Sequence, residues 1–171
     1  SASFFLGLYL RGGSTSYWFF STSARTWSLR SLFCVCSMRS SGLRFFGIWL
    51  AEGCTSRTNR TGVCVVAVSQ KDGPKARVIS DWIRACGFHA GERTNDHGIV
   101  QFSISNKQLY EYLVQFGKSH DKFVPRELLE LSSRQLRILY DAMMLGDGTR
   151  GWYATVSDQL ADDMMEIILK T

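Results

Sequence analysis

The chain has 171 residues, of which 45% are hydrophobic, and a formal net charge of +5 at pH 7. That is a one-domain length with enough apolar residues for a hydrophobic core. The apolar run Phe4 to Leu10 is far shorter than the roughly 20 residues of a membrane-spanning helix, which excludes that class of protein.

Residues 1–42 differ in composition from the rest. They hold four arginines and no lysine or acid, whereas residues 43–171 hold 16 basic and 15 acidic residues. We assign no fold to this Ser/Arg/aromatic-rich leader. Within it, FLGLYLRGGSTS (Phe5–Ser16) aligns without gaps to FFGIWLAEGCTS (Phe45–Ser56). It is either a decayed copy of that segment, with Gly12 in the place of an acid, or a chance similarity.

A helix ending in an acid and a glycine is predicted over Phe45–Gly53, FFGIWLAEG. About two turns of apolar and small residues precede Glu52, and a glycine stands where helices end. A carboxylate in the last turn faces the negative end of the helix dipole, which costs a few tenths to about 1 kcal/mol unless a cation offsets it. One such segment alone is more often an ordinary buried helix.

Two hairpins and two helices are predicted after this segment. The predicted order is strands at 54–60 and 63–69, a helix at Lys75–Ala85 with Ala76, Ile79, Trp82 and Ile83 on one side, strands at 88–93 and 99–105, and a helix from Asn106 to Gly117. Turn residues at Thr61-Gly62 and at 95–98 separate the paired strands. With the first helix, this is an αββαββα order.

Polar and basic side chains fall on the predicted hairpins. A two-stranded ribbon fits the DNA major groove, where Arg suits guanine and Gln or Asn suits adenine. The candidate DNA-binding residues are Arg57, Asn59, Arg60, Gln70, Lys71, Arg93 and Gln101. A register slip of one residue would turn each of them to the other face of the sheet, and a charged run is more often a solvated surface.

Lys122-Phe-Val-Pro125 precedes a second motif of the same plan as the first. Pro125 is placed to start a short helix at 126–131, and Ser132 or Ser133 to cap the next helix. Lys122 is either a loop cation or a residue that acts on a negatively charged group.

The second motif, Leu139–Gly148 (LYDAMMLGDG), places Asp147 95 residues after Glu52 (147 − 52). Small residues stand four apart in both segments, and small residues on one helical face let two backbones approach closely. The interface candidates are Gly47, Ala51, Ala142 and Gly146. Packed side by side, the two helices would bring both acids to one oxygen-rich site suited to Mg²⁺.

A strand and a helix are predicted after the second motif. Trp152 to Ser157 alternates like a strand, and Ser157 is placed to cap a helix over Asp158–Leu169. The apolar face predicted for this helix consists of Leu160, Met164, Ile167 and Ile168.

Cysteines and histidines show no metal-ligand spacing. The chain has five cysteines, an odd number without CxxC pairs: Cys34, Cys36, Cys54, Cys64 and Cys86. This pattern predicts reduced thiols and a cytoplasmic location, or an intracellular one in a prokaryote or phage. His89, His97 and His120 are scattered. The chain begins with Ser rather than Met, which indicates a fragment.

These motifs resemble those of the LAGLIDADG homing endonucleases, particularly the kind carried inside inteins. FFGIWLAEG and YDAMMLGDG both fit a nine-residue motif with its acid eighth and glycine ninth; Leu50 and Leu145 replace a first acid that is often present in the family. Lys122 to Pro125 resembles the family's K-x-x-P block, and the S-x-x-L-A-D-D run from Ser157 resembles the helix after the second motif. The resemblance covers about residues 43–171.

The resemblance implies an α+β fold, a LAGLIDADG αββαββα half-domain over 43–138 and the start of a second copy over 139–171. It also implies a site-specific endonuclease of double-stranded DNA with Mg²⁺ or Mn²⁺. Glu52 and Asp147 would bind the metal, while Lys122 would stabilise the scissile phosphate or help to activate the attacking water.

Alternatives remain open from the sequence. One is a catalytically inactive nucleic-acid-binding module, such as a transcription regulator or a maturase; another is a protein-interaction domain without affinity for DNA. The splicing blocks of an intein are absent from the 171 residues, so splicing is not assigned. The expected partners are a host protein, or extein, if the chain is part of an intein, and a missing second half or pseudo-symmetric partner.

Overall fold

The structure, a computed structural model, describes residues 39–171. The segment Phe5–Ser16, with its similarity to the first motif, lies outside the described residues. Among the described helices, none is long and apolar enough to cross a membrane.

The first part of the chain has the αββαββα order that the sequence predicts. Its elements are α2 (Ser40–Glu52), β1 (Gly53–Arg57), β2 (Cys64–Lys71), α3 (Pro74–Ala85), β3 (Gly91–Thr94), β4 (Ile99–Ile104), α4 (Lys107–Leu113) and a 3-10 turn, η1 (Val114–Phe116). Asn106 caps α4 as predicted, because its side chain accepts a hydrogen bond from the Leu109 amide at 2.9 Å. Strand β3 begins three residues later than predicted, since Phe88 packs its ring on Phe45 of α2 at 5.5 Å instead of entering the sheet.

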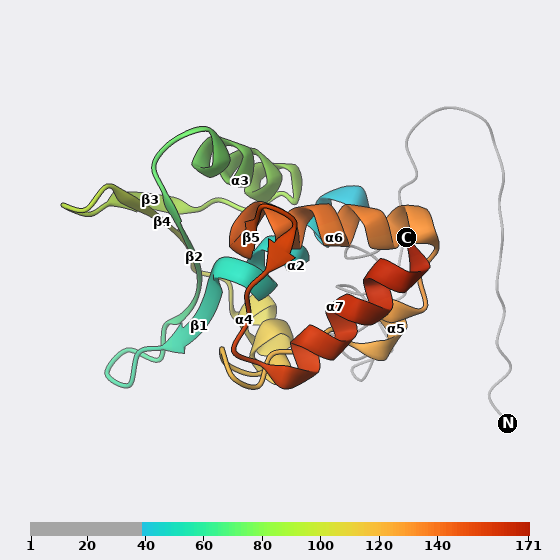
Figure 1. The fold of residues 1–171 in the computed structure, drawn as a ribbon. Coiled ribbons are helices and arrows are strands. Elements are labelled where there is room, and N and C mark those ends of the chain that lie inside the picture. The colour runs from blue at the N-terminus through green and yellow to red at the C-terminus, as the bar shows by residue number, and fades with distance from the viewer. Residues whose placement is uncertain (1–38) are drawn as a thin grey trace, which may run out of the picture.

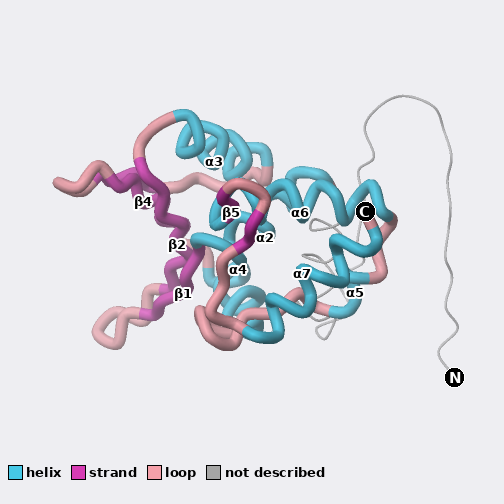
Figure 2. The backbone as a smooth tube through the Cα atoms, viewed as in Figure 1, coloured by secondary structure: helices cyan, strands magenta, loops and turns pink. Residues whose placement is uncertain are grey.

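The four strands form one antiparallel sheet in the order β1-β2-β4-β3. Helices gather on one side of this sheet, and its other side is open (Figure 1). The strands follow one another in a curved band that the tube view shows in magenta (Figure 2). The fold class is α+β, as predicted.

The pairing register decides which side chains face the helices. Val66 pairs with Ile104 and Val68 with Phe102, and all four side chains are buried. Because side chains alternate across a strand, the odd-numbered residues of β2 and β4 point to the open side. The sheet is therefore apolar toward the helices and largely polar on its outer face.

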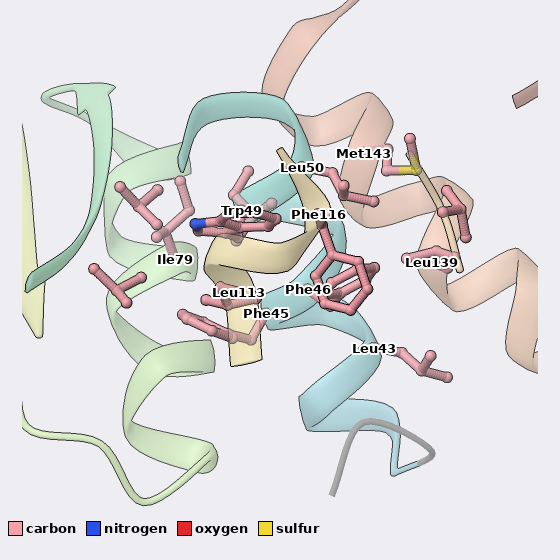
Figure 3. Packing of buried hydrophobic residues seen from close by; sticks show 14 of the residues in the cluster. Leu43, Phe45, Phe46, Trp49, Leu50, Ile79, Leu113, Phe116, Leu139 and Met143 are labelled. Carbon is pink, nitrogen blue, oxygen red and sulfur yellow. The ribbon is translucent and has the colours of Figure 1, made fainter. Parts of the chain in front are cut away.

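The core is built around α2, which lies between the other helices. Trp49 and Phe46 are at most 2% exposed, and the ring of Phe116 meets that of Phe46 edge-on at 5.3 Å. Ile79 of α3 and Leu139 of α6 approach α2 from its two sides (Figure 3). A helix with a nearly continuous apolar run, here residues 45–51, is expected to be buried in this way.

The second part of the chain adds helices next to α2. Its elements are α5 (Arg126–Leu129), α6 (Ser133–Asp147), β5 (Gly148–Thr149), β6 (Trp152–Tyr153) and α7 (Asp158–Lys170). Ser132 precedes α6, and its hydroxyl donates to Gln135 Oε1 at 2.8 Å. The strand predicted over 152–157 is shorter in the structure, because α6 extends to Asp147 and the turn at Arg150 and Gly151, both with positive φ, follows directly, so its partner β5 has only two residues to pair.

Helix α7 differs in part from the prediction. Ser157 caps it by accepting from the Leu160 amide at 3.2 Å, as expected. Its buried face contains Leu160, Met164 and Ile167, but Ile168 is 46% exposed, so this residue was wrongly assigned to the apolar face. The contact row follows steps of three and four from Leu160, and the position that completes it is the acid Asp163, which is buried.

Candidate two-carboxylate site

The two motif helices, α2 and α6, pack side by side and run in the same direction (Figure 1). A Cβ atom on Gly47 would lie 2.8 Å from the Ala142 Cβ, and one on Gly146 would lie 2.5 Å from the Ala51 Cβ. The paired residues are 95 apart in each case (142 − 47 and 146 − 51), as are the two acids. The four small residues therefore form the helix interface that the sequence predicts, and they set the helices in register.

This register brings Glu52 and Asp147 to the same end of the helix pair. Each acid is the last residue of its helix and is partly buried. Burial raises the pKa of both carboxyl groups, and the charge of Asp147 raises the pKa of Glu52 further. Two carboxylates that are far apart in sequence thus share one electrostatic environment.

The glycines after the acids are required for space rather than for a left-handed backbone. Gly53 and Gly148 have φ values of −93° and −79°, in the extended region. A Cβ at Gly53 would collide with the side chain and carbonyl of Trp49, and one at Gly148 with Met144. The chain therefore leaves each helix in a sharp extended turn directly after the acid.

Gln70 contacts the first acid. Its Nε2 donates a hydrogen bond to Glu52 Oε1 at 3.2 Å, which partly offsets the raised pKa of Glu52. Gln70 has this position because it follows Val66 and Val68 on the helix-facing side of β2. The structure therefore places Gln70, one of the candidate DNA-binding residues, beside the Glu52 carboxylate on the helix-facing side of the sheet.

The side chain of Lys122 contacts the C-terminal end of α2. Its ammonium group is buried and donates to the backbone oxygens of Trp49, Leu50 and Gly53 at 2.9, 2.7 and 2.8 Å. Burial lowers its pKa to about 8, although the charges of Asp147 and Glu52 act in the opposite direction. The charges of both acids act on the lysine, but its three donors are directed at two carbonyls in the last turn of α2 and at that of Gly53, the residue after the helix, where a cation also balances the helix dipole.

Two further residues near the acids were missed by the sequence reasoning. Lys75, in the first turn of α3, lowers the pKa of both carboxyl groups through its charge. The hydroxyl of Tyr153 is buried with no hydrogen-bond partner among the described residues. Its pKa is raised, first by burial and then by Asp147 and Glu52. In the sequence, Tyr153 is marked only by its position shortly after the second motif; in the structure it pairs with Gly148, the last residue of that motif.

The acids fit a divalent cation. Their mutual repulsion and their placement at the negative ends of two helices are both relieved by a bound cation, and carboxylate oxygens are the ligands that Mg²⁺ and Mn²⁺ prefer. No group of three or more His, Cys, Asp or Glu side chains gathers anywhere in residues 39–171, so water or substrate oxygens would have to complete the coordination. Within the described part of the chain, Cys54 and Cys64 are free thiols.

The outer face of the sheet carries three of the residues predicted to contact DNA. Two of them, Arg93 and Gln101, are paired neighbours, and Gln101 also pairs with Ser69. The side chains of Arg93, Gln101 and Ser69 therefore form one row across β3, β4 and β2. Lys71 points to the same side from the end of β2.

The three remaining residues of that set lie at the other end of the sheet. Arg57 pairs with Cys64, which places it on the helix-facing side of β1, although it is exposed there. Asn59 and Arg60 lie in the exposed turn between β1 and β2.

Comparison with curated proteins gives a similar sequence. A protein of Chlamydomonas moewusii named ATP-dependent Clp protease proteolytic subunit is 28% identical over 143 residues, which is 74% of this chain and 14% of that protein. The chain therefore spans about a seventh of the length of this relative. No protein-family model matches the chain.

Comparison with solved structures gives similar chains among homing endonucleases. I-DmoI in complex with DNA and Ca has a TM-score of 0.48 and 13% identity, over 67% of this chain and 60% of that one. An I-DmoI variant with its target DNA in the presence of Mg has a TM-score of 0.44 and 13% identity, over 65% and 64%. The homing endonuclease I-WcaI bound to its DNA recognition sequence has a TM-score of 0.35 and 14% identity, over 71% and 58%.

Proposed function

We propose that the chain is the catalytic part of a site-specific DNA endonuclease that hydrolyses phosphodiester bonds with Mg²⁺ or Mn²⁺. The observation that carries this proposal is the register of α2 and α6, which brings Glu52 and Asp147 together from 95 residues apart (147 − 52). Repulsion between two partly buried acids destabilises the fold, and a bound cation removes this cost.

Glu52 and Asp147 would hold the metal, which when bound lowers the pKa of a water molecule and neutralises charge on the phosphate. Gln70 fixes the orientation of the Glu52 carboxylate through its hydrogen bond. The charge of Lys75 reaches both acids from α3, on the exposed side of the site, where a DNA phosphate would approach. Lys122 would hold the C-terminal end of α2, and with it Glu52, in place through its hydrogen bonds to the backbone carbonyls there.

The outer face of the sheet would supply recognition of double-stranded DNA. It presents Lys71, Arg93 and Gln101 on one side, and the β1–β2 turn adds Asn59 and Arg60. Arginine and glutamine side chains on a curved antiparallel ribbon can reach base edges in the major groove, and lysine contacts phosphates.

The test of the catalytic proposal is cleavage of a DNA library by the full chain in Mg²⁺ or Mn²⁺ and in EDTA. D147N removes the charge of one ligand and is expected to abolish cleavage while DNA binding persists. D141N changes an exposed acid on the same helix and should leave cleavage unchanged. Cleavage by D147N at the rate of the unaltered chain would refute the two-carboxylate role, and binding without cleavage by the unaltered chain would favour the inactive DNA-binding module.

We further propose that the segment is part of an intein-type insertion in a longer host protein. This proposal rests on the motif resemblance and on the match to 14% of a much longer relative. Recovering the coding sequence on both sides is the test. Splicing blocks flanking the segment would support the proposal, and uninterrupted coding sequence of another kind would refute it. If such blocks are found, the host gene without the insertion is the first DNA to try as a substrate.

A further inference from the structure

The loop that carries Lys122 is held by α7, an element of the second part of the chain. The Ser157 hydroxyl donates a hydrogen bond to the Lys122 carbonyl oxygen at 2.7 Å, and the Val124 amide donates one to Asp163 Oδ2 at 2.6 Å. Both contacts are buried, and both join residues more than 30 apart in sequence. The loop is thus fixed at the lysine itself and two residues after it.

Asp163 is an unusual residue for the contact face of a helix. It is 4% exposed, although burial of a carboxylate is costly unless each oxygen is bonded. Its two oxygens accept from the Val124 amide and from Gln159 Nε2, the latter at 2.9 Å. The neighbouring Asp162 is exposed, so the helix carries a matched pair of acids of which only one reaches the loop.

These contacts continue to the candidate site. The side chain of Lys122 extends from the loop held by α7 to the backbone carbonyls at the C-terminal end of α2. Glu52 is the last residue of that helix. A shift of the loop would withdraw the ammonium group from those carbonyls and release the turn that fixes Glu52. The path therefore runs from α7 through Lys122 to the first acid.

We propose that Asp163 and Ser157 are positioning residues of the two-carboxylate site: they fix the loop at 122–124 so that Lys122 holds the end of α2 and the Glu52 carboxylate in place. The catalytic consequence rests on the function proposed above, whereas the positioning of α2 does not.

Positioning of the Lys122 loop can be distinguished from a general role of these residues in attaching α7 to the rest of the protein. Helix α7 is also attached through the ion pair of Arg126 with Glu166 at 2.9 Å and through the Lys170 ammonium, which donates to the Leu129 carbonyl at 2.8 Å. These contacts do not involve the Lys122 loop. E166Q weakens the docking of α7 without touching the loop, so it controls for the docking alone.

Hydrogen exchange of backbone amides, followed by mass spectrometry on the full chain without metal, tests the positioning directly. D163A is expected to speed exchange in peptides covering the end of α2 and the loop at 122–125 by roughly tenfold to a hundredfold, the factor for a lost hydrogen bond to a charged group. D163N keeps an oxygen acceptor and should restore most of the protection. D162A and E166Q should leave the end of α2 unchanged.

A second test measures whether the effect of Asp163 on α2 depends on Lys122. If Asp163 acts through the lysine, the K122M variant and the K122M/D163A double variant should show the same exchange at the end of α2. Additive effects of the two changes would overturn the proposal, as would unchanged exchange at α2 in D163A. If D163A does not fold, S157A replaces it in both comparisons, with the same expected and contradicting results.

The consequence for the site is measured with Mn²⁺, by electron paramagnetic resonance, and with DNA. D163A should weaken Mn²⁺ binding and lower kcat roughly tenfold to a hundredfold, as expected for a displaced catalytic group, with little change in DNA affinity. Loss of protection at α2 without an effect on Mn²⁺ binding would overturn the link to the metal site. Absence of cleavage in the unaltered chain would instead count against the proposed function.

Discussion

At the residue scale, the two acids occupy positions that do not favour stability. Glu52 and Asp147 each end a helix, where the dipole is negative, and each is partly buried next to like charge. Stability alone would favour an amide or a lysine at either position. The simplest physical reason for two acids at one spot is a cation that binds there.

Removal of one acid is therefore expected to stabilise the metal-free protein. D147N should raise the free energy of unfolding by about 0.3–1 kcal/mol, the scale of an unfavourable helix-end charge, which corresponds to about 0.6–4 °C in Tm for a chain of this length. Thermal unfolding in EDTA measures this effect. Mg²⁺ should raise Tm of the unaltered chain and not that of D147N; an equal Mg²⁺ response in both would contradict a site that requires Asp147.

The sequence predicts the identity of the acids but not all of their neighbours. Glu52, Asp147 and the small residues between the helices follow from spacing along single helices, which is a local property. Gln70 could not be placed, because one step of strand register decides which face of the sheet it occupies. The partners of Lys122 are backbone carbonyls 69 to 73 residues away, and no side-chain pattern marks them.

At the element scale, the α2–α6 contact has no space for an added methyl group. A Cβ on Gly146 would lie 2.5 Å from the Ala51 Cβ and 3.1 Å from the Glu52 Cγ. The Ala51 Cβ is fixed to the backbone of α2, whose buried side chains form much of the core, so it cannot move without disturbing that core. The glycine therefore sets the distance between the helices and, with it, the distance between the acids.

G146A should destabilise the protein despite the better helix propensity of alanine. Overpacking costs about 1–3 kcal/mol, which exceeds the gain of up to about 1 kcal/mol from replacing a helical glycine. Denaturant unfolding measures the difference. The A51G/G146A double variant returns the lost space and should recover much of the packing loss, although it places a new glycine in α2. A double variant less stable than the sum of the two single changes would contradict a direct contact.

Element boundaries were predicted less well than element order. Strand β3 starts late because Phe88 packs against the core, and β6 is short because α6 extends to Asp147 and leaves only two residues for its partner β5. In α7, Asp163 rather than Ile168 completes the buried face. The differences at Phe88 and Asp163 arise from contacts between distant segments, whereas the order of helices and strands follows from local periodicity and turn residues.

The attachment of α7 is expected to weaken in acid. The Lys170 ammonium donates a hydrogen bond to Glu166, and Arg126 pairs with the same carboxylate, so the pKa of Glu166 is lowered. A lowered pKa means that the folded state holds fewer protons at this group than the unfolded state. The contribution to stability is therefore present above the ordinary pKa near 4.5 and is lost as pH falls through the folded value.

E166Q should accordingly be less stable than the unaltered chain at pH 6, with the difference shrinking as pH falls below about 4. Thermal unfolding between pH 3 and 6 measures this convergence. E127Q, an exposed glutamate on α5, provides the control and should run parallel to the unaltered chain. A constant difference for E166Q across this range would contradict an ionic role.

At the scale of the whole molecule, the chain has two faces with different chemistry. The helices bury their apolar side chains against one face of the sheet, and the outer face presents polar and basic groups (Figure 1). Residues 43–171 are nearly neutral overall, with 16 basic and 15 acidic residues, so affinity for nucleic acid must come from this uneven placement. The sequence places polar and basic side chains on the predicted hairpins; only the strand register shows which of these side chains share a surface.

Binding of DNA through the outer face should show in the salt dependence. Each phosphate contact removed lowers the slope of log K against log salt by about 0.9, so K71A should reduce the slope by about that amount. Q101A should instead weaken binding at one base position with no change in slope, since a glutamine contact to a base edge carries no charge. Binding titrations of the D147N chain between 50 and 200 mM salt, in which cleavage is expected to be absent, measure both effects.

The matched control for these titrations is K107A. Lys107 is exposed at the start of α4 and pairs with Glu111 on the helical side of the molecule, so its removal should leave the slope unchanged. Equal losses from K71A and K107A would mean that DNA is attracted by overall charge and not by the outer face. A lower slope for K107A alone would move the interface to the helices. Because both lysines carry one charge and are exposed, the comparison separates the position of the charge from its amount.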